Sequence, residues 1–267
     1  MKIGVCTNMN AQGADKVGLE HLEAYQKAGC EYIELPLTQL MALEAGEREA
    51  LIKTARSSGL PCRACNCFFP GSVKVTGPDV SEARVQEYAR AAIEVAAALG
   101  TSFIVFGSSA ARNIPAGFSH QEAEKQFCAA LALSGDLAEP YGITIVIEPL
   151  NRMESNIINT FPDSLRLARS LNHPRVKCLV DYFHFALGNE SLEVIRSSRG
   201  WIKHTHIANI LERRVPVDSR EAPYADFIRN LKAGGYTGGI SIEGYTKTIE
   251  ADFAKAVALL KDCVTGC

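Results

Sequence analysis

Four residues able to bind a metal ion follow apolar segments in the second half of the chain. They are Glu148 in ITIVIEP, Asp181 in KCLVDY, His206 in HTHIAN and Glu243 in SIEGY. Each alone has an ordinary structural explanation, such as a helix cap, a core histidine or a carboxylate in a buried ion pair. Because they recur about one strand and one helix apart, we interpret them as parts of one site.

Three carboxylates and one imidazole form an oxygen-rich set of ligands. Such a set suits Mn²⁺ or Mg²⁺, with Co²⁺, Fe²⁺ and Zn²⁺ as alternatives. Without a cation, three carboxylates that point at one place would repel one another and raise each other's pKa. We therefore predict that these residues hold one divalent metal ion, with Mn²⁺ as the first choice.

The elements that must position these residues alternate between strand-like and helix-like segments. The predicted strands are Ile3–Asn8, Tyr32–Leu37, Cys62–Phe69, Phe103–Ser108, Thr144–Leu150, Val176–Tyr182, Ile202–Asn209 and Gly239–Tyr245. The predicted helices are Asp15–Ala28, Leu40–Ser57, Ser81–Leu99, Gln121–Tyr141, Pro162–Ser170, Leu192–Ser198, Tyr224–Ala233 and Ile249–Cys263. Eight such units predict an α/β fold, a single-domain (β/α)8 TIM barrel over residues 1–267.

In such a barrel, function is expected where the strands end at their carboxyl termini. Alternation along a strand turns Ile240 and Ile242 towards the helices and Glu243 towards the barrel axis. The same alternation places His204 one layer below His206 on the inner face. The four candidate ligands therefore converge on one point inside the mouth of the predicted barrel.

Composition narrows the classes of function. The 267 residues are 47% hydrophobic and 22% charged, with a formal net charge of -2. No Lys/Arg tract suggests nucleic-acid binding, and no stretch of about 20 apolar residues suggests a membrane span. Without an apparent leader, and with nine cysteines in no disulfide-like spacing, we expect a cytoplasmic protein. Cys62 and Cys65 are predicted not to form a metal site, since residues three apart in a strand face opposite sides.

Several motifs together resemble a known superfamily. IEPLNRMESN, VDYFHF, HTHIAN followed by RRVP, and SIEGY resemble the xylose-isomerase-like sugar isomerases and epimerases. Within that superfamily they are most similar to the ketose 3-epimerases of the D-tagatose and D-psicose (allulose) type. The resemblance implies a (β/α)8 barrel that binds one divalent metal through the four residues above, acts on a small sugar and assembles as a dimer or tetramer.

The resemblance also implies three substrate-binding residues. Glu154 lies six residues after the first ligand, and His184 lies three after Asp181, as in the family. The family's substrate-binding Arg is expected six residues after the metal-binding His, but Glu212 occupies that position here. Arg213 is the predicted equivalent because it keeps the distance to Pro216, and Arg214 remains an alternative.

The predicted chemistry is epimerisation at C3 of a ketose through a cis-enediolate. A bound metal ion would acidify the C3 proton, and Glu148 and Glu243, on opposite faces of the planar intermediate, would remove and return protons. The same site would also suit aldose–ketose isomerisation, hydroxypyruvate isomerisation or inosose dehydration. A non-catalytic sugar-binding module is the alternative outside enzymes. Phe68 and Phe69 are predicted either to wall the sugar site or to pack in the core.

Overall fold

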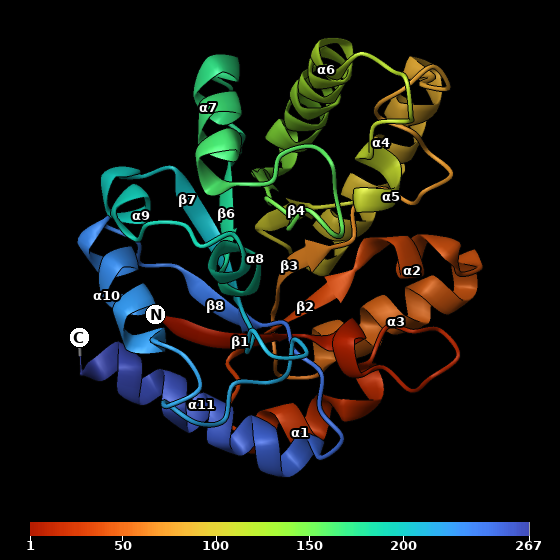
Figure 1. The fold of residues 1–267 in the computed structure, drawn as a ribbon. Helices are drawn as coiled ribbons and strands as arrows, with labels where there is room; N and C mark the ends of the chain where they lie inside the picture. Colours follow the sequence, from red (N-terminus) through yellow and green to blue (C-terminus); the bar gives the residue numbers. More distant parts are fainter. Residues whose placement is uncertain (267) are drawn as a thin grey trace.

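Eight parallel strands close into a barrel in the computed structural model, which describes residues 1–266 (Figure 1). The strands are β1 (Lys2–Cys6), β2 (Tyr32–Pro36), β3 (Cys62–Asn66), β4 (Phe103–Phe106), β5 (Thr144–Ile147), β6 (Val176–Asp181), β7 (Ile202–Ile207) and β8 (Gly239–Ile242). Each pairs with the next, and β8 pairs with β1 from Gly239 opposite Lys2 to Ile242 opposite Val5. The predicted (β/α)8 TIM barrel is confirmed.

Helices connect the strands around the outside of the barrel (Figure 1). The α-helices are α1 (Leu22–Lys27), α2 (Leu37–Ala42), α3 (Ala45–Ser57), α4 (Glu82–Leu99), α5 (Ser109–Arg112), α6 (His120–Ala138), α7 (Phe161–Leu171), α8 (Tyr182–Leu187), α9 (Glu193–Ser197), α10 (Tyr224–Ala233) and α11 (Ile249–Thr265). Three 3₁₀ turns, η1 (Thr7–Asn10), η2 (Leu19–His21) and η3 (Glu139–Tyr141), complete the described elements. None of the described helices is long and apolar enough to cross a membrane.

The core has two parts, as the alternation of the strands requires. Most apolar side chains, including Ile240 and Ile242, fill the layer between the strands and the helices. A smaller cluster of Val105, Val146 and Leu179 fills the barrel interior, with Phe103 packed against it. These apolar side chains lie on the inward faces of β4, β5 and β6. The polar candidate ligands lie beyond them, at the carboxyl ends of the strands.

The boundaries of several elements differ from the predicted ones. Every strand ends one to three residues earlier than predicted. At Asp181 the reason is visible, because its carboxylate accepts a hydrogen bond from the Phe183 N–H at 3.0 Å and starts α8, which was not predicted. The predicted helix from Asp15 begins only at η2, since Gly18 has a left-handed φ of 85°. The predicted helix Leu40–Ser57 is two helices, α2 and α3.

Cys62 and Cys65 do not face opposite sides of the sheet, contrary to the prediction from alternation. Both sulfur atoms approach Thr101 Oγ1, at 3.6 Å and 3.4 Å, so the two side chains lie on the same side of the sheet. The pairing of β2 with β3 shifts register between Ile33 and Glu34, and this irregularity breaks the simple alternation. Within residues 1–266, neither cysteine joins a group of three potential metal ligands.

Arg112 joins two strand ends and the loop that follows β5. Its fully buried guanidinium donates to the carbonyl oxygens of Phe106 at 3.1 Å, Glu148 at 2.9 Å and Ile158 at 3.4 Å. The guanidinium carbon also lies 5.7 Å from the centre of the Phe127 ring. The backbone of Glu148 is therefore anchored independently of its side chain.

Replacing Arg112 with Ala should destabilise the fold. The substitution leaves three buried carbonyl groups without this donor and removes a large side chain, so the free energy of unfolding should fall by about 2–4 kcal/mol. Urea denaturation measures it. Arg90→Ala, on the exposed face of α4, is the matched control and should change stability by less than about 0.5 kcal/mol. Equal stability of Arg112→Ala and the wild-type chain would contradict this role.

Candidate active site

The four predicted metal ligands meet at the carboxyl end of the barrel. Asp181 ends β6 and His206 lies in β7, while Glu148 and Glu243 each follow directly after β5 and β8. One potential ligand atom from each residue lies within 4.8 Å of the others, and all four residues are buried. His206 Nδ1 is 3.1 Å from a Glu148 oxygen and 3.0 Å from a Glu243 oxygen.

The electrostatics of this cluster fit a divalent cation. Burial raises the pKa of Glu148 despite its hydrogen bond with His206, and Glu243 adds to the rise. Burial also raises the pKa of Asp181 to about 7, against the effect of Arg213. On Glu243, Arg213 and His206 outweigh burial and hold the pKa at about 2. Glu148 and Asp181 therefore resist ionisation. A cation bound among these oxygen donors would stabilise their ionised forms.

Gly107 makes room for the Glu148 side chain. A Cβ atom at position 107 would overlap Glu148 Oε2, so any larger residue would push the carboxylate aside. Gly107 follows β4, and Arg112 holds the backbone carbonyl of Glu148 from the same connection. The connection between β4 and α6 therefore positions a residue that comes after β5.

His184 presents a single N–H to the site. Its Nδ1 accepts a hydrogen bond from the Asn151 backbone N–H at 3.2 Å, which leaves the proton on Nε2. Nε2 is buried without a hydrogen-bond partner, 3.5 Å from an Asp181 oxygen. Burial and Arg213 lower the pKa of His184 to about 3, so the ring is neutral. Such an orphaned donor suits an oxygen atom of a ligand.

Asn151 is a positioning residue that the sequence analysis did not identify. Its side-chain nitrogen lies 3.0 Å from His184 Nδ1 and donates to Glu154 Oε1 at 2.8 Å. Its side-chain oxygen accepts from the backbone N–H groups of Met153 and Glu154. One amide thus orients both His184 and Glu154. The polar cluster NRMES after Pro149 was the available signal, but its contacts depend on a turn that alternation does not predict.

Arg213, and not Arg214, faces the cluster. Its Nη2 donates to Glu243 at 2.6 Å and to Asp181 at 3.3 Å, and its Nη1 lies 3.6 Å from Glu154 Oε1. Arg214 lies on the exposed side, 3.8 Å from Glu212. Glu212 and Arg213 both have left-handed φ angles, 60° and 49°. The backbone turns at these two residues, and the Arg213 side chain points towards the cluster.

A cavity of about 490 Å³ opens over the cluster. Glu148, Glu154, Arg213 and Glu243 line it. Its other lining residues include Asn8, Thr38, Asn66, Phe69 and Ser109, contributed by the end of β3 and by the connections after the first four strands. Phe68 and Phe69 both pack against Phe106 in the core, and Phe69 also lines the cavity.

Glu34 is a second buried carboxylate that the sequence analysis missed. It lies on β2, fully buried, and contacts His204 and His206 from inside the barrel. His204 lies below the ligands, as predicted, and its ring stacks on Phe103 with centroids 5.6 Å apart. A carboxylate in the apolar run YIELPL was the signal, of the same kind as that for Glu148.

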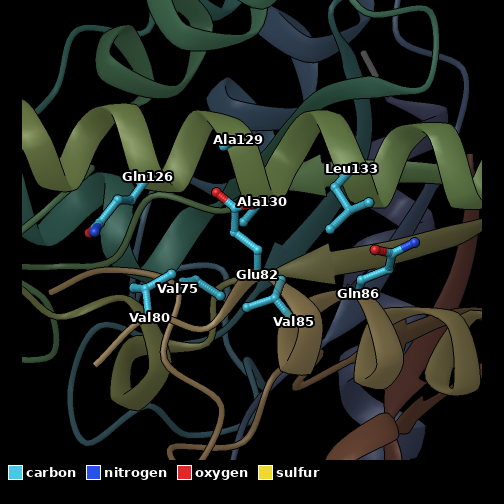
Figure 2. Close-up of a pocket in the computed structure, with 9 residues that line it drawn as sticks. All are labelled: Val75, Val80, Glu82, Val85, Gln86, Gln126, Ala129, Ala130 and Leu133. Carbon is cyan, nitrogen blue, oxygen red and sulfur yellow. The ribbon is translucent and has the colours of Figure 1, made fainter. Parts of the chain in front are cut away.

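A separate hollow of about 300 Å³ lies between α4 and α6 (Figure 2). Its walls are mostly apolar, with Val75, Val85 and Leu133 among them, and the polar side chains of Glu82, Gln86 and Gln126 also line it. It contains none of the predicted site residues. The chemistry therefore belongs to the cavity at the strand ends.

Comparisons with known proteins agree with this architecture. The family model for the xylose isomerase-like TIM barrel matches residues 22–263. A D-psicose 3-epimerase of Agrobacterium fabrum is 31% identical over 114 residues, which is 42% of this chain and 39% of the relative. A 2-oxo-tetronate isomerase of Haemophilus influenzae is 27% identical over 236 residues, 84% of this chain and 86% of the relative. The sequence match to the first thus spans well under half of its length.

Solved structures match over a greater length. The crystal structure of a D-psicose 3-epimerase with D-tagatose from Clostridium cellulolyticum superposes with a TM-score of 0.85, covering 99% of both chains at 18% sequence identity. At that identity the likeness establishes the fold alone. The resemblance to xylose-isomerase-like proteins that the motifs suggested is confirmed by the family model.

Mn²⁺ should stabilise the protein through the cluster at the strand ends. A cation that binds only the folded state at one hundred times its Kd adds about 2.7 kcal/mol to the free energy of unfolding. Asp181→Asn removes one charged ligand and should lose more than half of that gain. Thermal unfolding with Mn²⁺ and with chelator measures it. Asp79→Asn, in an exposed loop, should keep the full gain. If Mn²⁺ left the unfolding temperature of the wild-type protein unchanged, the metal site would be ruled out.

Proposed function

This chain belongs to the xylose isomerase-like TIM barrel family, and on that premise we propose that it is a metal-dependent ketose 3-epimerase. The observation that carries the proposal is the convergence of Glu148 and Glu243 on one centre with Asp181 and His206. The two glutamates come from strands separated by β6 and β7, and His206 Nδ1 lies about 3 Å from both. A module that only binds sugar has no need of two such buried carboxylates.

In the proposed reaction, Glu148 and Glu243 act as the acid/base pair. One removes the proton from C3 of the ketose, and the other returns a proton to the opposite face of the planar cis-enediolate. A divalent cation held by Glu148, Asp181, His206 and Glu243 would supply Lewis-acid polarisation of the carbonyl, with Mn²⁺ preferred and Mg²⁺, Co²⁺, Fe²⁺ or Zn²⁺ as alternatives.

Three further residues bind the sugar in this proposal. The neutral His184 donates its Nε2–H to O2, where negative charge develops, and the Arg213 guanidinium supports the same oxygen. Glu154, held by Asn151, accepts a hydrogen bond from the hydroxyl on C1. These roles use the orphaned donor of His184 and the inward position of Arg213.

The cavity favours a neutral, unphosphorylated sugar. Of the residues that line it, Arg213 is the one with a positive charge, and it already contacts three carboxylates. The lining also includes the amides of Asn8 and Asn66 and the hydroxyls of Thr38 and Ser109. Such groups suit the hydroxyls of a sugar, whereas a phosphate would lack a free cationic partner.

Isomerisation of a four-carbon 2-oxo acid is the second candidate function. It is supported by the match to a 2-oxo-tetronate isomerase, which covers 84% of this chain. The same acid/base pair would move a proton between adjacent carbons through a similar enediolate. The acidic cavity, with Arg213 engaged, disfavours a carboxylate substrate. We also propose, from the family resemblance, that the active protein is a homo-oligomer.

Deuterium exchange distinguishes these reactions. The Mn²⁺-loaded protein is incubated in deuterium oxide with free ketoses, phosphorylated ketoses and 2-oxo-tetronates, and NMR locates the label. We expect deuterium at C3 of an unphosphorylated ketose. Glu148→Gln and Glu243→Gln should each slow the exchange by roughly 10²- to 10⁴-fold, because each removes one acid/base group.

Glu87→Gln, on the exposed face of α4, is the control for these two variants and should exchange at the wild-type rate. Label at C1 or C2 of a ketose would indicate aldose–ketose isomerisation. Label on the four-carbon acids alone would favour the second candidate. No exchange with any substrate, with or without Mn²⁺, would refute an enediolate mechanism for this chain.

A further inference from the structure

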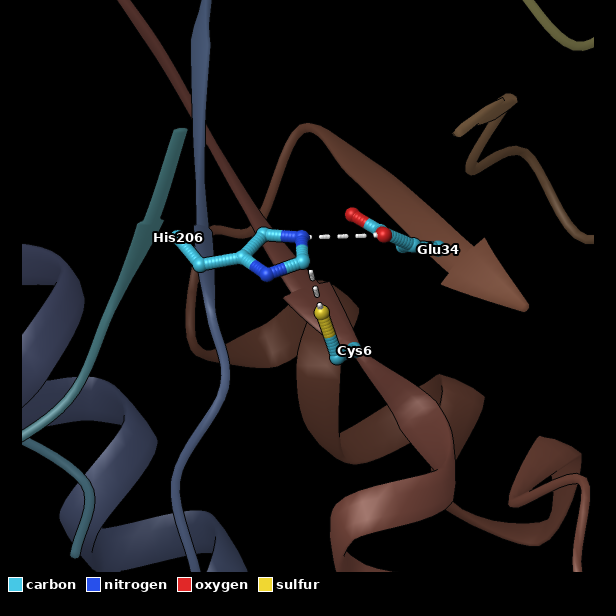
Figure 3. Close-up of side chains that lie close together, drawn as sticks. All are labelled: Cys6, Glu34 and His206. Carbon is cyan, nitrogen blue, oxygen red and sulfur yellow. Dashed lines mark hydrogen bonds and ion pairs between the residues drawn. The ribbon is translucent and has the colours of Figure 1, made fainter. Parts of the chain in front are cut away.

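Glu34 lies beneath the proposed metal site. Its strand, β2, is on the opposite side of the barrel from β6, which carries Asp181. The Glu34 side chain is fully buried. Figure 3 shows Glu34 reaching His206, which extends from β7 across the interior. Burial of an isolated carboxylate is costly, so its hydrogen bonds must account for its presence.

Three donors surround the Glu34 carboxylate. His206 Nε2 lies 3.0 Å from Oε1, and His204 Nε2 lies 2.7 Å from Oε2. The Ser241 hydroxyl donates to Oε2 at 2.8 Å, and the Tyr32 hydroxyl lies 3.0 Å from Ser241 Oγ. These contacts come from β7 and β8, the strands that also position two of the proposed ligands. Glu34 is therefore ionised and held in one orientation.

The geometry assigns different roles to the two nitrogens of His206. Because Glu34 can only accept, Nε2 carries the proton that it donates to Oε1. Nδ1 faces the opposite way, about 3 Å from oxygens of Glu148 and Glu243. Because Glu34 keeps a proton on Nε2, Nδ1 is the nitrogen that the imidazole would present to a metal ion at the point where the carboxylates meet.

Cys6 does not turn this arrangement into a second metal site. Its sulfur lies 3.8 Å from His206 Nε2, but that nitrogen is already directed at Glu34 (Figure 3). Both oxygens of Glu34 are likewise occupied by hydrogen-bond donors. With Nε2 donating to Glu34, His206 offers this group no lone pair for a cation, so the group orients a side chain.

We propose that Glu34 is a positioning residue that fixes the tautomer and ring orientation of His206 for metal binding at Nδ1. His204 and Ser241 hold Glu34 in turn, so the chain of contacts runs from β8 and β7 through β2 to the metal centre. The inference rests on the metal site of the proposed function. A carboxylate hydrogen-bonded to a metal-binding imidazole raises ligand basicity and restrains the ring.

Glu34→Gln tests the role at nearly constant volume. A Gln amide would direct N–H groups at the N–H of a histidine, so Mn²⁺ affinity should fall by roughly 10- to 100-fold. Titration followed by electron paramagnetic resonance measures free Mn²⁺ directly, without turnover. Activity should recover at saturating Mn²⁺, as expected of a residue that acts through a ligand. Glu31→Gln, an exposed carboxylate just before β2, should bind Mn²⁺ within about twofold of wild type.

Ser241→Ala keeps the charge of Glu34 and removes one of its donors, so it supplies the test if Glu34→Gln does not fold. Its Mn²⁺ affinity should fall by a smaller factor, roughly twofold to tenfold. In the Mg²⁺-loaded protein, long-range proton–nitrogen NMR should report the Nε2–H tautomer of His206 in wild type and its loss in Glu34→Gln. Wild-type Mn²⁺ affinity in the folded variants, or no Mn²⁺ binding by wild type, overturns the role.

The two proposals can fail separately. A wild-type protein that binds Mn²⁺ but epimerises no sugar, with weaker binding in Glu34→Gln, would refute the function and retain the positioning role. A wild-type protein that epimerises a ketose, with unchanged Mn²⁺ affinity in Glu34→Gln and Ser241→Ala, would retain the function and refute the positioning role.

Discussion

Repulsion among buried carboxylates is the constraint on which the rest of the site depends. Five acidic side chains lie at the mouth or inside the barrel: Glu34, Glu148, Glu154, Asp181 and Glu243. Two arginines offset part of this charge, the partly exposed Arg213 by direct contact and the fully buried Arg112 from behind Glu148. A divalent cation would offset two more charges. The buried acidic and histidine side chains could therefore hold a cation.

The same constraint explains why so many supporting residues surround the cluster. Carboxylates that repel one another must be held by contacts stronger than the repulsion. Gly107 leaves space for Glu148, and Arg112 anchors its backbone carbonyl. Asn151 orients His184 and Glu154 through one amide. The strands bring the site residues together, and the loops after β4, β5 and β7 then fix the orientation of their side chains.

The sequence predicted the parts of the site that follow from regular strands. Alternation placed Asp181 and His206 on the inner face because both lie beyond the register shift in the pairing of β6 with β7, which falls between Cys178 and Leu179. It misplaced Cys65 because β3 pairs with β2 through a register shift. Arg112 and Asn151 could not be predicted, since their contacts depend on turns that bring distant segments together. Glu34 carried a readable signal, a lone carboxylate in an apolar strand, but its partners lie on strands far along the chain.

The contact between Glu34 and the two histidines bears on whether half of the barrel could form the site without the other half. All four proposed metal ligands come from the second half of the chain, β5 to β8, which suggests a self-sufficient half-barrel. Yet the imidazole among them is oriented by a residue of β2, and Ser241 reaches that same residue. A fragment comprising β5 to β8 and their helices would keep all four proposed ligands but would lose the contact that orients His206. Assembly of the proposed metal site would thus be coupled to closure of the barrel between β8 and β1, so that ligand geometry and ring closure form one cooperative unit.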